Sequence, residues 1–352
     1  MKHQTTRYGE IPFYKIGTFG NTADAFISKK LFLEYKTKYS FPKKGDILIS
    51  ASGTIGRAVI YDGKPAYFQD SNIVWIDNDE TLVKNDFLFY AYSNVKWNTE
   101  HTTILRLYND NFRNTLIPLP PLNEQIAIAN ILSALDRYLC ALDALILKKE
   151  SVKKALSFEL LSQRKRLKGF NQAWQRVRLG DIANYLTSNL SAEQITQQGK
   201  IKVYDVNNFI GYTDTTFISD KPYISIVKDG SVGRVRILPP KTNILSTMGA
   251  LIANHRTTTE FLFYLLSNFD FKNFTSGSII PHIYFKDYKE KTIFLPPLNE
   301  QIAIANILSA LDNEIASLKN KKRQFENIKK ALNHDLMSAK IRVLKKISFI
   351  TK

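Results

Sequence analysis

The string LPPLNEQIAIANILSALD occupies residues 119–136 and returns, identical at all 18 positions, at residues 295–312. The offset is 176 residues, half of the 352-residue chain. Solenoid repeats have periods of only about 20 to 50 residues, so this period indicates a different organisation. The chain is predicted to be a duplicated module in the order globular region, helix, globular region, helix.

Each copy of the repeat carries the signals of a helix start. Pro120 and Pro121 disfavour helix before them, Asn123 can accept a hydrogen bond from the first-turn amides, and Glu124 complements the helix dipole. A looser match continues through residues 153–162 and 329–338. Each predicted helix therefore has about 44 residues and a length of about 65 Å. For scale, one turn of B-DNA is about 34 Å long, so two regions at the ends of such a helix could contact DNA at separated places.

Apolar residues alternately four and three apart run along both predicted helices, the heptad pattern by which one helix supercoils on another. The first seam consists of Ile128, Leu132, Leu135, Leu139, Leu142 and Ile146. The second consists of Ile304, Leu308, Leu311, Ile315 and Leu318, followed after Lys322 by Phe325, Ile328, Leu332 and Leu336. Because one globular region lies between the helices, the simplest pairing within one chain is antiparallel, with the globular regions at opposite ends.

The formal charge of +17 favours a polyanionic partner, and most of the excess lies on the predicted helices. Residues 148–168 carry eight basic and two acidic side chains, and residues 319–346 carry ten and two. A solvated helix face explains these segments as well as a polyanion contact does. No apolar run approaches the roughly 18 residues of a membrane span. Cys140, the single cysteine, is predicted to be a buried thiol.

The two globular regions, residues 1–118 and 170–294, share three landmarks within predicted mixed α/β or α+β domains. Residues 11–19 loosely match 201–209, residues 52–59 match 229–236, and residues 87–94 match 261–268. The third landmark is interpreted as a core helix with Phe87, Leu88, Tyr90 and Ala91 inward. Base stacking is the weaker alternative for its aromatic residues.

The second landmark is a Gly-[Thr/Ser]-x-Gly-Arg turn between apolar strands. Small residues allow backbone amides to approach a phosphate, and Arg57 and Arg234 can reach a phosphate or a guanine edge. A plain β-turn with a surface arginine explains the same residues. The candidate DNA-binding residues are Ser52, Thr54, Arg57, Lys228, Ser231 and Arg234.

The sequence shows no motif for chemistry. It has no Gly-x-x-x-x-Gly-Lys-[Ser/Thr], no Asn-Pro-Pro-[Tyr/Phe] and no paired-cysteine or His-Glu-x-x-His spacing. The five histidines are scattered and are interpreted as solvated or core residues: His3, His101, His255, His282 and His334. We expect no catalytic residue, no metal and no cofactor.

The duplicated LPPLNEQ-type segments and GTIGR-type loops resemble the specificity subunit of type I restriction-modification systems over nearly the whole chain. The resemblance implies two α/β target recognition domains separated by two long helices that form an antiparallel intramolecular coiled coil with pseudo-two-fold symmetry. It implies target recognition domain 1 at 1–118, repeat helix 1 at 119–169, target recognition domain 2 at 170–294 and repeat helix 2 at 295–352. Because the domains diverge outside their landmarks, the implied DNA site is asymmetric and bipartite.

The resemblance also implies partners: double-stranded DNA, two methyltransferase subunits and, through the complex, restriction and translocase subunits, in the cytoplasm and without a membrane. S-adenosylmethionine, ATP and Mg would belong to those subunits. Methyltransferase contacts are implied near two equivalent sets: Pro120, Pro121, Asn123, Glu124 and Gln125, and Pro296, Pro297, Asn299, Glu300 and Gln301. A simple capping motif is the alternative for both sets.

One departure concerns the beginning of each globular region. The second opens with WQRVRLGDIANYL at residues 174–186, whereas nothing comparable precedes Ile11. Matching Tyr14 to Tyr204 implies that about 25 to 30 residues have no counterpart in the first region, which puts its full activity in doubt. Alternatives to DNA recognition are a coiled-coil scaffold that binds only proteins, an inactive or truncated specificity subunit, and, least favoured, a stand-alone nuclease or methyltransferase.

Overall fold

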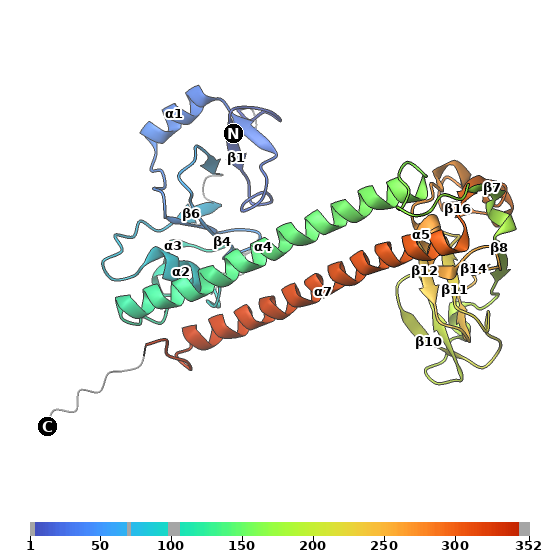
Figure 1. Ribbon diagram of the computed structural model, residues 1–352. Coiled ribbons are helices and arrows are strands. Elements are labelled where there is room, and N and C mark those ends of the chain that lie inside the picture. The colour runs from blue at the N-terminus through green and yellow to red at the C-terminus, as the bar shows by residue number, and fades with distance from the viewer. Residues whose placement is uncertain (1–3, 69–71, 98–105, 345–352) are drawn as a thin grey trace. The chain divides into compact units, whose positions relative to one another are not determined.

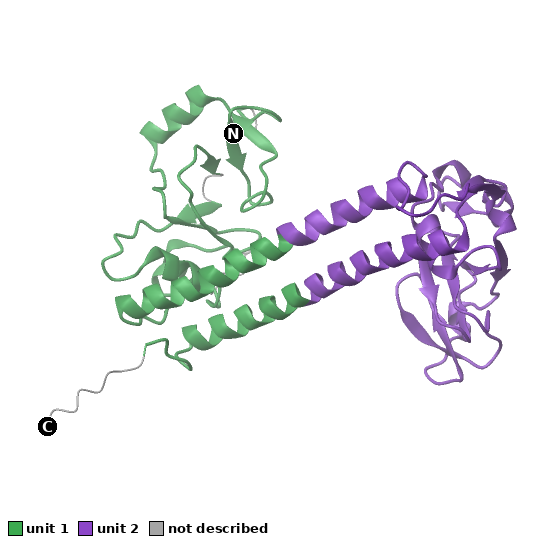
Figure 2. Cartoon of the chain, viewed as in Figure 1, with its two compact units in different colours: residues 1–143, 321–352 green, residues 144–320 purple. Residues whose placement is uncertain are grey.

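The computed structural model describes residues 4–68, 72–97 and 106–344. The chain divides into two compact units, unit 1 with residues 1–143 and 321–352, and unit 2 with residues 144–320 (Figure 2). Two long helices, α4 (Leu122–Leu161) and α7 (Leu298–Met337), each have 40 residues (Figure 1). The boundary between the two units falls within each of them (Figure 2). Each unit thus combines one globular region with a half of each helix.

The two helices pair antiparallel in both units. In unit 1, Asp143 pairs with Lys322 at 2.7 Å, and Asp136, earlier on α4, pairs with the later Lys329 on α7. In unit 2, Lys149 pairs with Glu314 at 2.8 Å, and Lys153 with Asp312 at 2.5 Å. Residue numbers rise on one helix as they fall on the other, so the predicted antiparallel pairing is confirmed.

The predicted seam is largely buried between the helices. Eight of its residues are less than 9% exposed: Ile128, Leu132, Leu142, Ile146, Ile304, Leu308, Ile315 and Leu336. Six others are partly buried: Leu135, Leu139, Leu311, Leu318, Phe325 and Leu332. Phe325 packs on Tyr138 with ring centroids 4.7 Å apart.

Two expectations about the helices are wrong. Ile328 is 51% exposed, because the inward position one residue later is taken by Lys329, which binds Asp136 and lies 5.5 Å from the Tyr90 ring. Cys140 is exposed, because one residue beyond the partly buried Leu139 is a rotation of about 100° away from the seam.

In its described residues, the globular part of unit 1 contains two small sheets and three short helices. One sheet has the order β2-β1-β5 and the other β4-β3-β6. The strands are β1 (Ile11–Tyr14), β2 (Ala25–Ile27), β3 (Ile47–Ser50), β4 (Ala58–Ile60), β5 (Tyr67–Phe68) and β6 (Ile73–Trp75). The helices are α1 (Lys29–Lys38), α2 (Asn85–Tyr92) and α3 (Asn109–Arg113).

Unit 2 repeats this plan with additional strands. Its sheets have the orders β10-β9-β13, β12-β11-β14-β8, β15-β16 and β17-β7. The strands are β7 (Gln175–Arg178), β8 (Ala183–Thr187), β9 (Ile201–Tyr204), β10 (Phe209–Thr213), β11 (Tyr223–Val227), β12 (Val235–Leu238), β13 (Thr242–Ile244), β14 (Met248–Ala253), β15 (Thr275–Ser276), β16 (His282–Ile283) and β17 (Thr292–Leu295). The helices are α5 (Thr259–Ser267) and α6 (Phe285–Tyr288), with 3-10 turns η1 (Leu179–Asp181), η2 (Ala192–Gln194) and η3 (Lys272–Phe274).

The third landmark forms α2 and α5, which pack on the long helices. Phe87, Leu88, Tyr90 and Ala91 are all buried, as predicted for a core helix. The Tyr90 hydroxyl donates to Asp136 at 2.8 Å, and the Tyr264 hydroxyl donates to Asp312 at 2.9 Å. Burial raises the pKa of both tyrosines, so each hydroxyl keeps the proton that it donates.

The predicted fold class is confirmed: α+β globular regions carried by two long helices that pair antiparallel as an intramolecular coiled coil. Among the described residues, no helix combines the length and the apolar character needed to cross a bilayer.

Candidate nucleic-acid interface

The Gly-x-x-Gly-Arg segment forms the same hairpin turn in both units. The amide of Gly56 donates to Ser50 and the amide of Gly233 donates to Val227, each at 2.9 Å. The φ angles of Gly53, Gly56, Gly230 and Gly233 are +71°, +80°, +85° and +80°. Glycine adopts this left-handed region at low cost, and a Cβ at Gly56 or Gly233 would also collide with Trp97 or Phe271. The sequence therefore specifies this turn.

Each hairpin arginine forms a hydrogen bond to the first landmark of its own unit, residues 11–19 or 201–209. Arg57 donates to the carbonyl of Phe19 at 2.9 Å, and Arg234 donates to Asn207 Oδ1 at 2.8 Å. Both arginines are exposed, and each bond uses one of the five guanidinium N–H donors. Arg236 donates to the Asn207 carbonyl at 2.9 Å. The guanidinium groups are thus held in place and remain open to a ligand.

The other predicted DNA-binding residues differ in accessibility. Thr54 and Ser231 are exposed at the turn, and Lys228 is partly exposed. Ser52 is only 8% exposed and forms a β-bridge with Arg106. The structure gathers the predicted residues of each unit at one hairpin, and it makes Ser52 the least accessible of them.

The sequence interpretation missed a second segment that bridges each hairpin, through Arg106 in unit 1 and through His282 in β16 of unit 2. Asp229 bridges His282, the counterpart of the Ser52 bridge to Arg106, and His282 Nδ1 lies 2.7 Å from Asp229 Oδ1. Two residues further on, Tyr108 is 43% exposed and Tyr284 is 51% exposed. An ungapped match upstream of the repeat, at the same offset of 176, could have found these pairs.

The remaining histidines form no site in the described chain. His255 and His334 are exposed, as expected of solvated residues, whereas His3 and His101 lie outside the described residues. Within residues 4–68, 72–97 and 106–344, no three His, Cys, Asp or Glu side chains are grouped to hold a metal ion.

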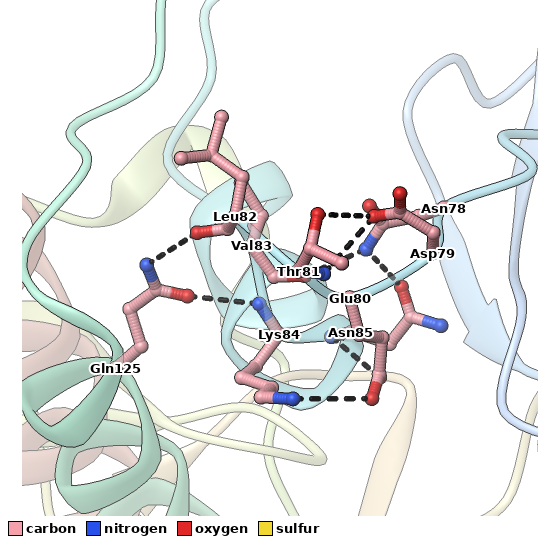
Figure 3. A network of polar contacts seen from close by, with 9 residues as sticks. All are labelled: Asn78, Asp79, Glu80, Thr81, Leu82, Val83, Lys84, Asn85 and Gln125. Carbon is pink, nitrogen blue, oxygen red and sulfur yellow. Dashed lines mark hydrogen bonds and ion pairs between the residues drawn. The ribbon is translucent and has the colours of Figure 1, made fainter.

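Near the start of each long helix, one glutamine side chain forms hydrogen bonds to the backbone of the loop before α2 or α5. Gln125 accepts from the Lys84 amide at 2.8 Å and donates to the Leu82 carbonyl at 3.1 Å (Figure 3). It also donates to the Pro120 carbonyl at 2.8 Å. Gln301 accepts from the Thr258 amide at 3.1 Å and donates to the Arg256 and Pro296 carbonyls at 3.0 and 2.8 Å. Each glutamine therefore ties the loop before α2 or α5 to the start of a long helix.

Figure 3 shows how the loop before α2 presents these groups to Gln125. Glu80 accepts a hydrogen bond from the Asn85 amide at 3.0 Å and pairs with the Lys84 ammonium at 3.7 Å. Asn78 donates to the Val83 carbonyl at 2.7 Å and to Asn85 Oδ1 at 2.8 Å. The loop is therefore held by hydrogen bonds within itself as well as by those to Gln125.

The two repeated glutamates are buried anchors for arginines. Arg342 donates two hydrogen bonds to Glu124, which lower the pKa of that carboxyl. Arg166 donates two to Glu300, at 3.2 and 2.6 Å, and Trp174 Nε1 donates a third at 2.9 Å. Glu124 and Glu300 are 2% and 0% exposed. In each unit, this glutamate therefore connects the start of one long helix to residues just beyond the end of the other long helix.

The residues implied at methyltransferase contacts thus fall into two groups. Glu124, Gln125, Glu300, Gln301 and Pro296 are buried within their units. Pro121, Asn123 and Asn299 are exposed, and Pro120 and Pro297 are partly exposed. Beside them, two exposed apolar pairs stand at identical repeat positions: Leu122 and Ile126, at 40% and 45% exposure, and Leu298 and Ile302, at 44% and 46%.

Many basic side chains of the long helices are engaged across the helix pair. Lys149, Lys153, Lys319, Lys322 and Lys329 each pair with an acidic residue on the opposite helix. This favours the helix-face interpretation for those five lysines. The hairpins, not the paired lysines of the helices, are therefore the candidate interface.

Comparisons with known proteins agree with this architecture. The model of the type I restriction modification DNA specificity domain matches residues 1–150 and 171–327. A putative type I restriction enzyme specificity subunit of Haemophilus influenzae is 63% identical over 137 residues, 39% of this chain and 36% of that protein. The putative MjaX specificity subunit of Methanocaldococcus jannaschii is 29% identical over 335 residues, 85% of this chain and 79% of that one.

Solved structures share the fold. The S subunit of a type I restriction-modification system from M. genitalium matches with a TM-score of 0.63 and 20% identity, over 96% of this chain and 91% of its own. A chain from work on complex assembly and conformational transition of the type I R-M system matches with a TM-score of 0.55 and 18% identity, over 86% and 82%.

Proposed function

The chain belongs to the type I restriction modification DNA specificity family, and from that premise we propose that it reads double-stranded DNA and performs no chemistry itself. The observation that carries the proposal is the hairpin that occurs twice, each time with a positioned, exposed arginine. Each unit would read one half of a bipartite site, and the two halves would differ because the surroundings of the hairpins differ.

The groups around each hairpin suit base and phosphate contacts. Arginine forms bidentate bonds to guanine, and backbone amides and hydroxyls such as that of Thr54 suit phosphates. Exposed Tyr108 and Tyr284 add an aromatic surface beside each hairpin. Lys286 lies 5.5 Å from the Tyr284 ring and adds a positive charge there. We infer that these two tyrosines border the DNA-binding surface.

Two methyltransferase subunits are the proposed protein partners. Since Glu124, Gln125, Glu300 and Gln301 are used inside the units, the contacts would fall on the exposed residues of the repeat. Leu122 with Ile126 and Leu298 with Ile302 form two apolar patches of identical sequence, which suits two copies of one partner. The buried glutamates and glutamines would hold these patches in position.

The test of DNA reading uses Arg57→Ala and Arg234→Ala. Each is expected to weaken binding to the preferred DNA by about 1–3 kcal/mol and to relax the preference at one half-site only, because each removes one guanine contact. Binding is measured by gel shift on a randomised DNA library, alone and with a methyltransferase partner. Arg137→Ala, an exposed arginine on α4, is the matched control and should leave the preference unchanged.

Equal loss on all sequences would assign the arginines to phosphates. If neither the chain nor its complex with methyltransferase prefers any sequence, DNA reading is excluded and the protein-only scaffold is favoured.

A further inference from the structure

Unit 2 has an exposed apolar turn beside its candidate DNA-binding hairpin. Residues 277–281 connect β15 to β16 and have the sequence Gly-Ser-Ile-Ile-Pro. Ile279 is 93% exposed and Ile280 is 54% exposed, whereas Ile283, further along in β16, is 1% exposed. The corresponding turn of unit 1 falls within residues 98–105, outside the described residues, so the inference concerns unit 2.

Backbone hydrogen bonds hold this turn against the hairpin. The Gly230 amide donates to the Pro281 carbonyl, and the Ile283 amide donates to the Lys228 carbonyl, each at 2.9 Å. These two bonds lie on either side of the ion pair between Asp229 and the next residue of β16. The turn is therefore fixed to the residues that we propose to contact DNA.

The composition of the turn is unusual in its two central residues. Gly277 has a φ angle of +89°, and a Cβ there would lie 2.3 Å from the Ile280 carbonyl oxygen, so this position requires glycine. Glycine, serine and proline are common in turns, and Gly277, Ser278 and Pro281 follow that preference. Ile279 and Ile280 do not, because β-branched aliphatic residues favour strands.

The core of unit 2 makes little use of these two side chains. A side chain that stays exposed to water adds almost no hydrophobic stabilisation, since that stabilisation is proportional to the apolar area removed from water. A single exposed isoleucine is common on protein surfaces. Two adjacent ones on a turn that is held in place form an exposed apolar patch, which is typical of a binding surface.

The charges beside the patch favour a nucleic acid as its ligand. The Val227 amide donates to the Arg234 carbonyl at 3.0 Å, which places exposed Arg234 across the hairpin from Val227, next to Lys228. The acid of this hairpin, Asp229, is engaged by His282 at 2.7 Å. A ligand that meets both the apolar turn and these basic residues must present apolar groups beside negative charge.

The major groove of DNA meets this requirement. It is about 12 Å wide and admits a two-stranded β-ribbon such as β15 with β16. Its floor carries hydrogen-bond donors and acceptors and one kind of apolar group, the C5-methyl of thymine. Isoleucine side chains cannot form hydrogen bonds, so among the standard base pairs the methyl group is what they can recognise.

We propose that Ile279 and Ile280 contact thymine C5-methyl groups in the major groove, so that unit 2 selects thymine within its half-site. This inference rests on the proposed DNA reading and adds to it a base and the residues that select it. Arg234 would bind guanine or a phosphate from the adjacent hairpin, and the turn would supply the apolar part of the recognition.

The experiment replaces thymine by uracil, which differs from thymine only in lacking the C5-methyl group. A preferred DNA is first selected from a randomised library by the protein in its methyltransferase complex. Each thymine of that DNA is then replaced singly by uracil, and affinities are compared by competition gel shift. We expect at least one replacement to weaken binding about fourfold, the effect of losing one buried methyl group.

Variants connect this loss to the turn. The double variant Ile279→Ser, Ile280→Ser should bind the thymine and uracil DNAs equally, because no aliphatic side chain remains there to meet the methyl group. Ile279→Val should keep the discrimination, since valine is also a branched aliphatic residue. Leu147→Ser, at a 63% exposed position of α4, is the matched control and should discriminate as the unaltered protein does. Each protein is compared with itself on two DNAs, so a change in stability does not imitate the result.

Several outcomes would overturn the inference while leaving DNA reading intact. These are a preferred DNA that lacks thymine, indifference of the unaltered protein to every uracil replacement, and a double variant that still discriminates. Discrimination only between cytosine and 5-methylcytosine would overturn it in favour of the other base with a C5-methyl group. Weaker methyltransferase binding by the double variant, with thymine discrimination unchanged, would make the turn a protein contact. A protein without any sequence preference would overturn the proposed function as well.

Discussion

At the scale of single residues, the repeat encodes its own internal contacts. Identical glutamates, glutamines and aspartates make equivalent contacts in the two units: Glu124 and Glu300 hold arginines, and Gln125 and Gln301 clamp loops. Charged and amide groups are rarely buried without partners, so these contacts explain why polar residues begin an otherwise amphipathic helix. Their role is to fix the helix start to the globular region.

Glu124 and Glu300 are expected to contribute differently to the free energy of unfolding. Glu300→Ala should lower the free energy of unfolding of unit 2 by about 2–3 kcal/mol, because Arg166 and buried Trp174 both lose their acceptor. Glu124→Ala should cost unit 1 about 1–2 kcal/mol, because the half-exposed Arg342 can turn to water. Native-state hydrogen exchange measures each unit separately.

The control for this pair is Glu326→Ala, whose exposed carboxylate pairs with Lys322 at 3.4 Å and should change stability by less than about 0.5 kcal/mol. Equal costs for Glu124 and Glu300 would show that the bond from Trp174 contributes no more than the backbone hydrogen bond that Glu124 accepts from Val343.

At the scale of elements, the seam of α4 and α7 is continuous but uneven. Leu308 is fully buried, Leu311 is partly buried, and Ile328 is exposed because Lys329 takes the inward place. Heptad spacing alone could not distinguish Ile328 from Lys329, since a lysine stem can cover apolar surface while its ammonium reaches an acid. The acid that draws Lys329 inward, Asp136, lies on the other helix.

Alanine substitutions along α7 should follow this order. Leu308→Ala is expected to cost about 2–5 kcal/mol, and Leu311→Ala less, because less apolar surface and a smaller cavity are involved. Ile328→Ala serves as the control and should fall within about 0.5 kcal/mol of the parent, since its side chain is half exposed and alanine favours helix. A cost at Ile328 as large as that at Leu308 would contradict the exposed placement.

At the scale of the whole molecule, the charge of +17 has two different uses. Part of it neutralises acids across the helix pair, as Lys149 and Lys329 do. Another part, including Arg57, Lys228 and Arg234, lies at the hairpins. Since only charges that meet phosphates release counterions, the net charge by itself would overstate the strength of the proposed DNA binding.

The salt dependence of DNA affinity should distinguish basic residues that pair with acids across the helices from basic residues that contact phosphates at the hairpins. Lys228→Ala is expected to reduce the slope of log affinity against log salt by about one, because one phosphate contact is lost. Lys149→Ala, which removes a basic residue paired with Glu314, should leave the slope unchanged. Affinity is measured on one DNA across a range of salt concentrations. A reduced slope for Lys149→Ala would instead place the helices on DNA.

The sequence by itself determined the duplication, the two helices, their antiparallel seam and the hairpins, because heptad spacing, proline and glycine act locally and appear twice in the chain. Only the tertiary structure decided that Glu124 and Gln125 face inward, that Tyr108 and Tyr284 flank the hairpins, and that Ile279 and Ile280 are exposed on a turn fixed to a hairpin. Those features depend on partners more than 40 residues away, such as Lys84 for Gln125 and Arg342 for Glu124. Such pairings cannot be predicted from local sequence patterns, because the two partners are not neighbours in the sequence.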